Sequence, residues 1–519
     1  AHTWHPSSMK LAKIIDNTRC IGCHACSTAC KSENEVPLGV DRTRVKYVET
    51  GVFPNVRRHF QVTRCNQCEN PPCATACPTA AMFQRKDGIV DFDKDWCIGC
   101  KACIAACPYD AIFINPEDHS AEKCNFCAHR LDVGLEPACV VVCPTQAILI
   151  GDLNDPSSRV SQIVHRDPVA VRRPEKDTQP KLFYKHGTQA TLDPLAAERP
   201  GGGTFLWSEQ RSGGQFVVGG HPPEASRAGS NSSAAAMLAY DIPHKAPWDW
   251  RVSLYTVTKA IAAGAYLVPL LLLLAGKLAP TSPLWLWGAP LLGLIFLAVT
   301  GGLLISDLTH PLRFYLIFTR PQWKSWLVRG SFLIAGYGLV LTAHLGAAWL
   351  GKTELLLPLS VAGAPLALAT AIYTAFLFAQ AKARDLWQSA LLPPHMAVQT
   401  VLAGAGATLL LALAIEPKAA PSIYWMLFLS VAMHLLLLAG EVALPHGSAH
   451  ARLAIWEMTT GRFRNFFRAG GVLLLATLAA ATLAPHSAVP AAAAAVAALA
   501  GLLAHEHAYV QAGQSVPLA

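Results

Sequence analysis

Apolar residues are concentrated in the second half of the chain. From about residue 250 onward, eight apolar segments are each near or above the roughly 18–20 residues that span a bilayer as an α-helix. Stretches 270–275 and 409–415 have no polar face, which disfavours a soluble helix bundle as the alternative. The pattern therefore predicts an all-α bundle of eight transmembrane helices in a lipid bilayer, at residues 252–275, 284–305, 327–350, 355–379, 390–415, 422–441, 468–484 and 488–504.

The first 150 residues are distinguished by cysteine. All 16 cysteines of the 519-residue chain lie between Cys20 and Cys143, so the hydrophobic share of 52% averages two unlike parts. This division disfavours a single globular enzyme with one core. Disulfide scaffolds are short secreted chains, and this chain is neither short nor uniformly rich in cysteine.

The cysteines form four groups with the spacing of iron–sulfur ligands. Three thiolates on a curling loop can hold three corners of an iron–sulfur cube, and a fourth cysteine before a proline serves the other cluster of a pair. Cys-Pro occurs at the end of three of the four groups. The groups are Cys20, Cys23, Cys26, Cys30 (C-x2-C-x2-C-x3-C); Cys65, Cys68, Cys73, Cys77 (C-x2-C-x4-C-x3-C); Cys97, Cys100, Cys103, Cys107 (C-x2-C-x2-C-x3-C); and Cys124, Cys127, Cys139, Cys143 (C-x2-C-x11-C-x3-C).

Other cysteine chemistries fit this pattern less well. Zinc ribbons also use C-x2-C pairs, but they do not need third and fourth cysteines at these offsets. Residues 20–24 match the C-x-x-C-H signature of covalent haem attachment, yet Cys26 and Cys30 follow at cluster spacing, so we expect His24 to be incidental. Disulfides would compete for the same sulfurs. The pattern favours iron–sulfur clusters.

The four motifs resemble those of the iron–sulfur electron-transfer subunits of molybdopterin oxidoreductases, such as the dimethyl sulfoxide, polysulfide and nitrate reductases. The resemblance covers roughly residues 10–150. It implies an α+β ferredoxin-like domain of tandem two-cluster modules with four [4Fe-4S] clusters, in which the first motif pairs with the fourth and the second with the third. The implied ligand sets are Cys20, Cys23, Cys26 with Cys143; Cys124, Cys127, Cys139 with Cys30; Cys65, Cys68, Cys73 with Cys107; and Cys97, Cys100, Cys103 with Cys77.

Residues 151–248 are rich in proline, glycine, serine and aspartate. Their apolar content is too low for an independent core, which predicts an extended linker between domains at 1–150 and 249–519. We expect it to drape over the iron–sulfur domain or a partner, with Trp207, Phe216 and Tyr240 as anchor points. A flexible linker without fixed contacts is the alternative.

The formal charge of +8 is located mainly in one set of loops between spans. An even number of spans puts both ends of the membrane half on one side, and the loops of that side carry twelve cations against three on the other. This bias predicts an inner (cytoplasmic) membrane protein with a cytoplasmic iron–sulfur domain, although some of the charge could serve docking to that domain. Residues 2–17 lack a signal-peptide apolar run, and no nucleic-acid partner is expected. The twelve cations on the side of the iron–sulfur domain are Lys245, Arg251, Arg313, Arg320, Lys324, Arg329, Lys382, Arg384, Arg452, Arg462, Arg464 and Arg468, and the three on the opposite side are Lys277, Lys352 and Lys418.

Ionisable and polar residues gather at the span ends that face the iron–sulfur domain. Such residues in a membrane are functional candidates, and a quinone needs carbonyl donors and proton exchange beside an apolar slot. Interfacial snorkelling is the alternative, and it suits Lys259 and Arg384. Acids at helix C-termini, such as Asp307 and Glu441, fit it less well. The quinone-site candidates are Tyr255, Lys259, Asp307, His310, Arg313, Gln380 and Glu441, together with His505, Glu506 and His507, which are expected to follow the eighth span.

Haem b is the competing membrane cofactor and needs two histidines at similar depth. His344 lies about 27 Å along the third span from the cluster side, and His434 about 10 Å along the sixth, at 1.5 Å per residue. These two histidines are not expected to face each other, so no haem is expected.

Three loop stretches resemble the polysulfide-reductase (NrfD-like) membrane subunit. They are residues 306–314 (SDLTHPLRF), 319–326 (TRPQWKSW) and 509–517 (YVQAGQSVP). The resemblance covers the whole membrane half and implies eight spans, no haem and a quinone site. The sequence departs from the usual pattern because the iron–sulfur and membrane subunits are fused.

Together these features predict an electron-transfer and membrane-anchor subunit of a quinone-linked oxidoreductase. It would relay electrons between menaquinone or ubiquinone and a separate catalytic subunit, expected to carry molybdopterin, with sulfite or another sulfur oxyanion as substrate by analogy. Two alternatives remain open: a proton-translocating quinone module, or the same relay serving a hydrogenase or a multihaem cytochrome.

Overall fold

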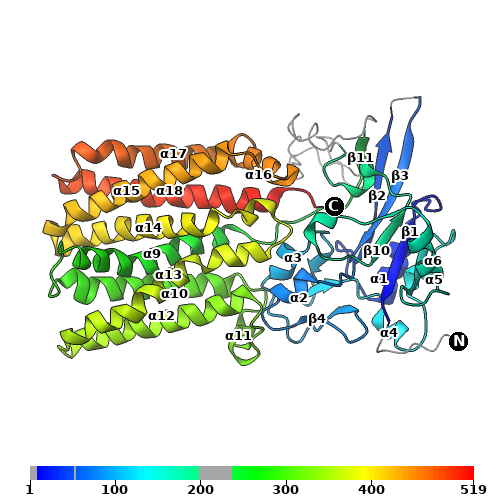
Figure 1. The fold of residues 1–519 in the computed structure, drawn as a ribbon, viewed down its shortest axis with the longest axis horizontal. Helices are drawn as coiled ribbons and strands as arrows, with labels where there is room; N and C mark the ends of the chain where they lie inside the picture. The colour runs from blue at the N-terminus through cyan, green and yellow to red at the C-terminus, as the bar shows by residue number, and fades with distance from the viewer. Residues whose placement is uncertain (1–8, 52–53, 198–235, 519) are drawn as a thin grey trace.

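The computed structural model describes residues 9–51, 54–197 and 236–518. Figure 1 shows an N-terminal part of short strands and helices at one end of the long axis and a bundle of long helices at the other. Of the expected linker anchors, Trp207 and Phe216 lie outside the described residues.

Two small sheets frame the N-terminal part. The first has the strand order β8-β1-β10-β9, with β1 and β10 parallel and the other pairs antiparallel. All six residues of β1 are buried, as expected for an inner strand covered on both faces. The second sheet is antiparallel, in the order β11-β2-β3. The strands are β1 (Leu11–Asp16), β8 (Ile148–Asp152), β9 (Val169–Ala170), β10 (Leu182–Lys185), β2 (Thr43–Thr50), β3 (Arg57–Arg64) and β11 (Ala236–Tyr240).

The cysteine motifs lie on short helices and loops between these sheets and two hairpins. The hairpins pair β4 with β5 and β6 with β7, and each follows a cysteine-bearing helix, which is the α+β arrangement expected for a ferredoxin-type domain. The expected fold class of this half is therefore confirmed. The strands are β4 (Met82–Gln84), β5 (Val90–Phe92), β6 (Ile112–Ile114) and β7 (Ala121–Lys123), and the helices are α1 (Ala25–Glu33), α2 (Pro72–Ala76), α3 (Ala102–Ala106), α4 (Ala128–Leu131) and α5 (Ala138–Val141).

The described part of the expected linker is folded onto the iron–sulfur half. The sequence placed the end of that domain at residue 150, but β10 pairs with β1, and β11, which contains Tyr240, pairs with β2. Residues too polar to form a core of their own thus gain backbone partners at existing strand edges. This segment also contains helices α6 (Arg159–Arg166) and α7 (Gln189–Leu192).

The membrane half contains eight helices long and apolar enough to cross a bilayer, as expected. The first begins after Asp249, whose carboxylate accepts a hydrogen bond from the Arg251 backbone N–H at 2.8 Å. The eighth is longer than expected: it continues to Ser515 because its polar residues face other helices. The helices are α9 (Trp250–Leu274), α10 (Ala289–Ser306, preceded by a π-helical turn), α12 (Trp326–Trp349), α13 (Leu356–Gln380), α14 (Leu392–Ile415), α15 (Ala420–Ala443), α17 (Arg464–Ala479) and α18 (Ala488–Ser515), with the short α11 (Leu316–Thr319) and α16 (Ala449–Thr459) beside them.

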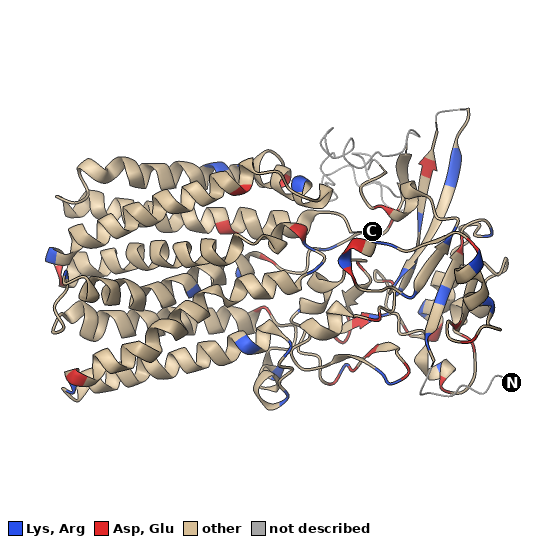
Figure 2. Cartoon of the chain, in the orientation of Figure 1, with Lys and Arg blue, Asp and Glu red and all other residues tan. Residues whose placement is uncertain are grey.

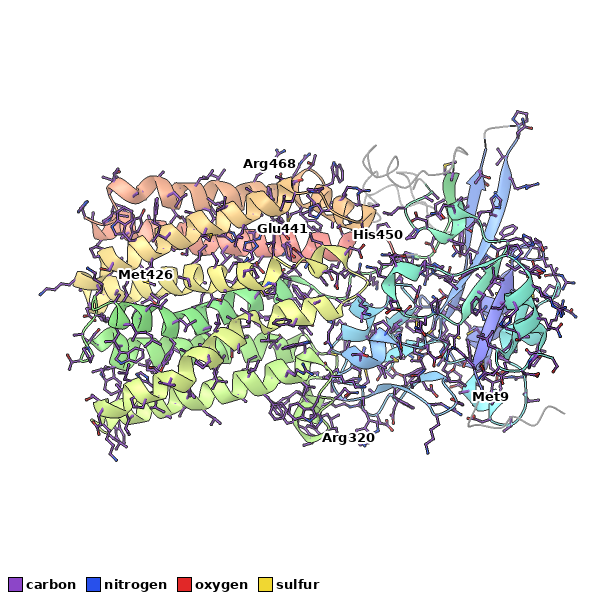
Figure 3. All side chains as sticks on the ribbon, in the orientation of Figure 1. Met9, Arg320, Met426, Glu441, His450 and Arg468 are labelled. Carbon is purple, nitrogen blue, oxygen red and sulfur yellow. The ribbon has the colours of Figure 1, made fainter. Side chains whose placement is uncertain are left out.

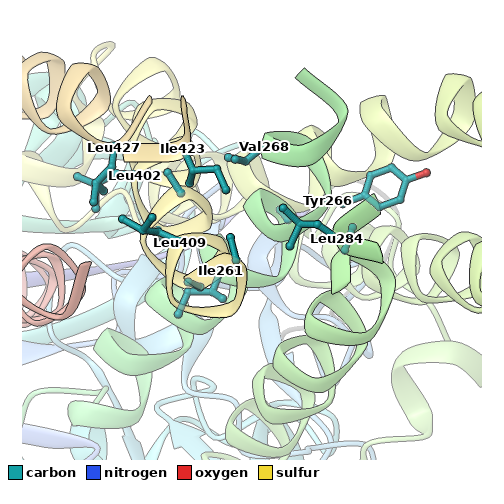
Figure 4. Close-up of a cluster of buried hydrophobic side chains, with 14 of the residues drawn as sticks. Ile261, Tyr266, Val268, Leu284, Leu402, Leu409, Ile423 and Leu427 are labelled. Carbon is teal, nitrogen blue, oxygen red and sulfur yellow. The ribbon is translucent and has the colours of Figure 1, made fainter. Parts of the chain in front are cut away.

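Helices α9 and α14 form the interior of the bundle. In their most apolar stretches 78% and 61% of residues are buried, against 17–39% in the other six spans. Figure 4 shows part of the core between them, including Ile261, Leu402 and Leu409. The two helices touch at Gly264 and Gly404, where a Cβ on Gly404 would lie 2.3 Å from the Gly264 carbonyl carbon. Only glycine fits both positions of this contact.

This contact predicts a stability difference between two glycine substitutions. Gly404→Ala should lower the melting temperature of the detergent-solubilised chain, because overpacking costs about 1–3 kcal/mol. The matched control is Gly302→Ala in α10, where an added Cβ meets nothing within 4 Å and the melting temperature should not fall. Equal melting temperatures for the two variants would contradict the close helix contact.

Candidate electron-transfer and quinone sites

The cysteines line three cavities as mixed sets from different motifs. In each set, three cysteines come from one motif and the fourth comes from the motif paired with it in the sequence interpretation. The short helices that begin inside each motif turn the sulfurs toward a common space. The sets are Cys77 with Cys97, Cys100, Cys103; Cys143 with Cys20, Cys23, Cys26; and Cys107 with Cys65, Cys68, Cys73.

The remaining four cysteines also lie together. The Asn34 amide nitrogen is 3.7 Å from the sulfurs of both Cys30 and Cys127. Burial, and then the neighbouring Cys124 and Cys139, raise the pKa of the Cys30 thiol to about 12. Four buried thiols this close are a soft sulfur donor set, which is the chemistry that binds iron–sulfur clusters.

A buried arginine faces the sulfur of Cys139. Arg64 is 1% exposed, and its Nη1 is 2.9 Å from Cys139 Sγ. Lys13 Nζ lies 3.6 Å from the same sulfur. Burial alone raises the pKa of Cys139, but the charges of Arg64 and Lys13 outweigh it and lower the pKa to about 7. Arg64 Nε and Nη2 have no hydrogen-bond partner among the described residues, so unused donors beside this cysteine set suit a negatively charged cluster.

His24, which the sequence analysis expected to be incidental, makes hydrogen-bond contact with a strand. Its Nε2 lies 2.6 Å from the Tyr47 hydroxyl, which in turn donates to the Gly22 carbonyl at 2.7 Å. Lys101 occupies the equivalent position in the third motif, and both residues have left-handed backbone angles, with φ of 60° and 62°. The two positions differ in their surroundings: His24 contacts a strand, whereas Lys101 reaches the membrane half.

The third cysteine motif forms the junction with the membrane bundle. Two backbone N–H groups of the loop after α10, those of Thr309 and His310, donate to the carbonyls of Gly99 and Ile98 at 3.4 and 3.2 Å. Gly99 has a φ of +72°, and a Cβ there would lie 1.5 Å from Thr309 Oγ1. On the other side, Trp248 Nε1 donates to the Cys100 carbonyl at 3.2 Å.

Three of the quinone-site candidates belong to this junction. Asp307 accepts from Lys101 Nζ at 2.9 Å, so its acid at a helix C-terminus has a cation beside it. Burial raises the pKa of Asp307, and the Lys101 charge offsets part of this effect. Arg313 Nη1 donates to the carbonyls of Lys94 and Cys97 at 2.9 and 3.1 Å, and His310 Nε2 lies 3.3 Å from the Ser120 hydroxyl.

Gln380 holds the start of the third span. Its Oε1 accepts from the Trp326 backbone N–H at 2.8 Å, and its Nε2 donates to the Lys324 carbonyl at 2.7 Å. Both of its polar groups are therefore used within the loop before α12.

Tyr255, Lys259 and Glu506 are brought together inside the bundle. Lys259 is 2% exposed, donates to Thr374 Oγ1 and lies over the Tyr373 ring at 4.5 Å, so it does not extend to the membrane surface. Glu506 accepts from Gln399 Nε2 at 2.7 Å and lies close enough to Lys259 to interact electrostatically. Arg384 is buried too and donates to the Gln514 carbonyl at 2.9 Å. The snorkelling alternative therefore fits neither Lys259 nor Arg384.

The expectation that residues 505–507 follow the last span is wrong. They lie within α18, and His505 and Glu506 point into the bundle with 2% and 3% exposure. The sequence signal was masked because an alanine-rich helix with polar residues on one inner face has low hydropathy at that end. His507 is partly exposed and packs on the Phe466 ring.

Glu441 lies beside histidines rather than beside Lys259. Its Oε2 is 3.9 Å from Nδ1 of His395, and His395 Nε2 is 2.8 Å from His434 Nδ1. His344 is elsewhere, against Tyr266 and Trp285, so the two histidines weighed as haem ligands lie in separate clusters. Sequence reasoning missed His395, Thr374 and Gln399, because each lies within a largely apolar helix and the partners that it meets come from other helices.

Part of the positive charge at the loops serves the domain junction, the alternative left open by the sequence. Arg320 lies over the Trp96 ring of the iron–sulfur half, and Arg313 donates to the carbonyls of Lys94 and Cys97. Figure 2 shows few charged residues along the helices and many at the junction and beyond it.

The fold and the cysteine sets define an iron–sulfur domain joined to a multi-pass membrane module. Family comparison gives the same division: a 4Fe-4S dicluster domain matches residues 56–153, and the polysulphide reductase NrfD family matches residues 241–518. Because the NrfD match spans more than half of the chain, this protein belongs to the NrfD family. It is a fusion of an iron–sulfur part with an NrfD part. The expected resemblance to both subunits is confirmed.

Curated relatives match about a third of the chain. A subunit of tetrathionate reductase from Salmonella typhimurium is 44% identical over 204 residues, which cover 38% of this chain and 80% of the relative. The NrfC homologue of Haemophilus influenzae is 47% identical over 184 residues, 34% of this chain and 82% of the relative. A polysulfide reductase polypeptide of Wolinella succinogenes is 44% identical over 177 residues, 34% of this chain and 93% of the relative.

The four cysteine sets predict the iron content of the purified chain. With one [4Fe-4S] cluster in each set, iron and acid-labile sulfide analysis should each give about sixteen atoms per chain. A content of about eight irons or fewer would contradict the four-cluster assignment.

The cation beside Cys139 predicts an effect on reduction potential. Arg64→Gln should lower the potential of one cluster by tens of millivolts, because a cation stabilises the added electron and about 59 mV corresponds to 1.4 kcal/mol. Redox titration followed by EPR measures the shift. Arg85→Gln is the control, since Arg85 pairs with Asp87 and Asp132. An equal shift in both variants would show that Arg64 has no specific role.

Proposed function

We propose that this chain relays electrons between a membrane quinone and a separate catalytic subunit, through four [4Fe-4S] clusters. Such clusters carry one electron at a time when bound, and the cysteine sets of this chain provide the ligands. The observation that carries the proposal is the backbone contact between the third cysteine motif and the loop after α10. It puts one cysteine set directly against the membrane helices.

The exposed end of the iron–sulfur half is the proposed contact for the catalytic partner. Cys23 is exposed, and apolar side chains around the same set reach solvent, including Ile21, Val141 and Val142. Apolar residues exposed beside a redox centre are typical of a protein interface. This set lies in the first and fourth motifs, whereas the junction set lies in the second and third, so electrons could enter at one end and leave at the other.

The proposed quinone site is the buried polar cluster of Tyr255, Lys259 and Glu506, with Thr374 and Gln399 beside them. It lies on the two interior helices, α9 and α14, and on the neighbouring α13 and α18. A lysine or tyrosine donor could bind a quinone carbonyl, and Glu506 could exchange the proton that accompanies the electrons. Either menaquinone or ubiquinone offers these carbonyls.

Sulfur chemistry is the proposed activity of the catalytic partner. Two relatives are named for tetrathionate and polysulfide reductases, and both names specify sulfur compounds. We propose a molybdopterin subunit that acts on sulfite or another sulfur oxyanion. The charge bias of the loops supports an inner-membrane location with the iron–sulfur half in the cytoplasm.

Replacing Glu506 tests the quinone site. In the dithionite-reduced chain, Glu506→Gln should slow reoxidation by a short-chain quinone about 10²-fold, because a proton-exchange group is lost. The cluster EPR signals and the rate with ferricyanide should not change. The matched control is Glu416→Gln, an acid at the opposite end of the bundle that binds the Ser282 hydroxyl. Equal quinone rates in the two variants would remove Glu506 from the site.

A further inference from the structure

Three buried histidines from three different spans meet inside the bundle. They are His395 of α14, His434 of α15 and His505 of α18, which are 3%, 0% and 2% exposed. One ring nitrogen of each lies within 4.8 Å of a ring nitrogen of both others. The rings are in mutual contact, with centroids 4.7 Å apart for His395 and His434 and 4.9 Å apart for His434 and His505.

This cluster contains more polar atoms than the described residues can satisfy. The His395–His434 hydrogen bond uses one nitrogen of each ring, whereas His434 Nε2 and His505 Nδ1 are buried with no hydrogen-bond partner. The adjacent Glu441 and Glu506 each have one carboxylate oxygen, Oε2, in the same condition. A buried polar atom without a partner costs about 1–3 kcal/mol, so several at one place indicate that a further group binds there.

A buried carboxyl group also lies beside the imidazoles. Glu441 is 4% exposed, and among the described residues the one basic group within salt-bridge distance of it is His395, at 3.9 Å. Figure 3 shows Glu441 inside the bundle, on the part of α15 that is nearer to the iron–sulfur half. A carboxylate buried among neutral rings is stabilised by a cation.

We propose that His395, His434, His505 and Glu441 bind one divalent transition-metal ion of the zinc type. Three imidazoles and one carboxylate are a common donor set for such ions, whereas calcium and magnesium prefer all-oxygen sites. The ion would satisfy the open ring nitrogens and the carboxylate together. It would also tie α14, α15 and α18 to one another close to the proposed quinone site.

Metal binding requires only a small rearrangement of the rings. Nitrogens in a tetrahedral zinc site are about 3.3 Å apart, since each zinc–nitrogen bond is about 2.0–2.1 Å. The ligand nitrogens of the three rings lie within 4.8 Å of one another, so they would move toward this spacing by short distances. Rotation about χ1 and χ2 of the histidines is sufficient for such shifts.

Zinc retention by the full chain tests this proposal. Detergent-purified protein with its iron content intact is incubated with excess Zn²⁺, desalted and analysed by mass spectrometry. The wild type should retain one zinc per chain, and His434→Gln should retain less than about a tenth of that amount. His344→Gln is the matched control, because His344 is an equally buried histidine in another cluster and its loss should leave one zinc bound.

X-ray absorption at the zinc edge identifies the ligands without any variant. Nitrogen and oxygen ligands at about 2.0–2.1 Å support the histidine site, whereas sulfur at about 2.3 Å would assign the zinc to free cluster thiolates and overturn the proposal. Equal zinc retention by the wild type and His434→Gln would overturn it as well. Absence of bound zinc in the wild type would do the same, and would leave the histidines a role in hydrogen bonding or proton transfer. None of these outcomes depends on the quinone proposal.

Discussion

The contact between the third cysteine motif and the loop after α10 determines how the two halves are related. It consists of backbone hydrogen bonds from Thr309 and His310 to the motif, and of the Lys101–Asp307 ion pair. Backbone atoms can approach this closely because position 99 is glycine. Since the same motif supplies three cysteines of one set, this packing contact also fixes the distance between that set and the membrane helices.

A second set of contacts also holds the two halves together. Arg173 and Lys176, on the segment after β9, both bind Asp385 between α13 and α14. Arg172 donates to the Leu518 carbonyl at 2.7 Å, which attaches the same segment to the C-terminal end of the membrane half. A segment that composition alone identifies as a linker therefore binds the membrane half through its side chains. The iron–sulfur and NrfD parts are joined here both by the continuous polypeptide and by these non-covalent contacts.

The sequence was most informative where chemistry requires a fixed spacing or a fixed length. Cysteine offsets indicated cluster ligands, and runs of apolar residues indicated eight spans, because a bilayer sets their length. Contacts between distant residues could not be obtained in this way. Nothing in the sequence near Asp307 identifies Lys101 as its partner, and the meeting of His395, His434 and His505 depends on how their three helices pack. Glu506 was identified as a candidate but was misplaced beyond the span, since hydropathy falls where a helix buries polar residues inside a bundle.

The proposed relay can be tested by finding which cysteine set controls electron flow to quinone. Cys97→Ser alters the set at the junction, and Cys20→Ser alters the set at the exposed end. After dithionite reduction and mixing with quinone, rapid-freeze EPR follows the remaining clusters, once iron analysis has shown that they are assembled. If electrons reach quinone through the junction set, Cys97→Ser slows reoxidation of all remaining clusters and Cys20→Ser leaves their rate unchanged. The opposite order, or equal rates in both variants, would contradict it.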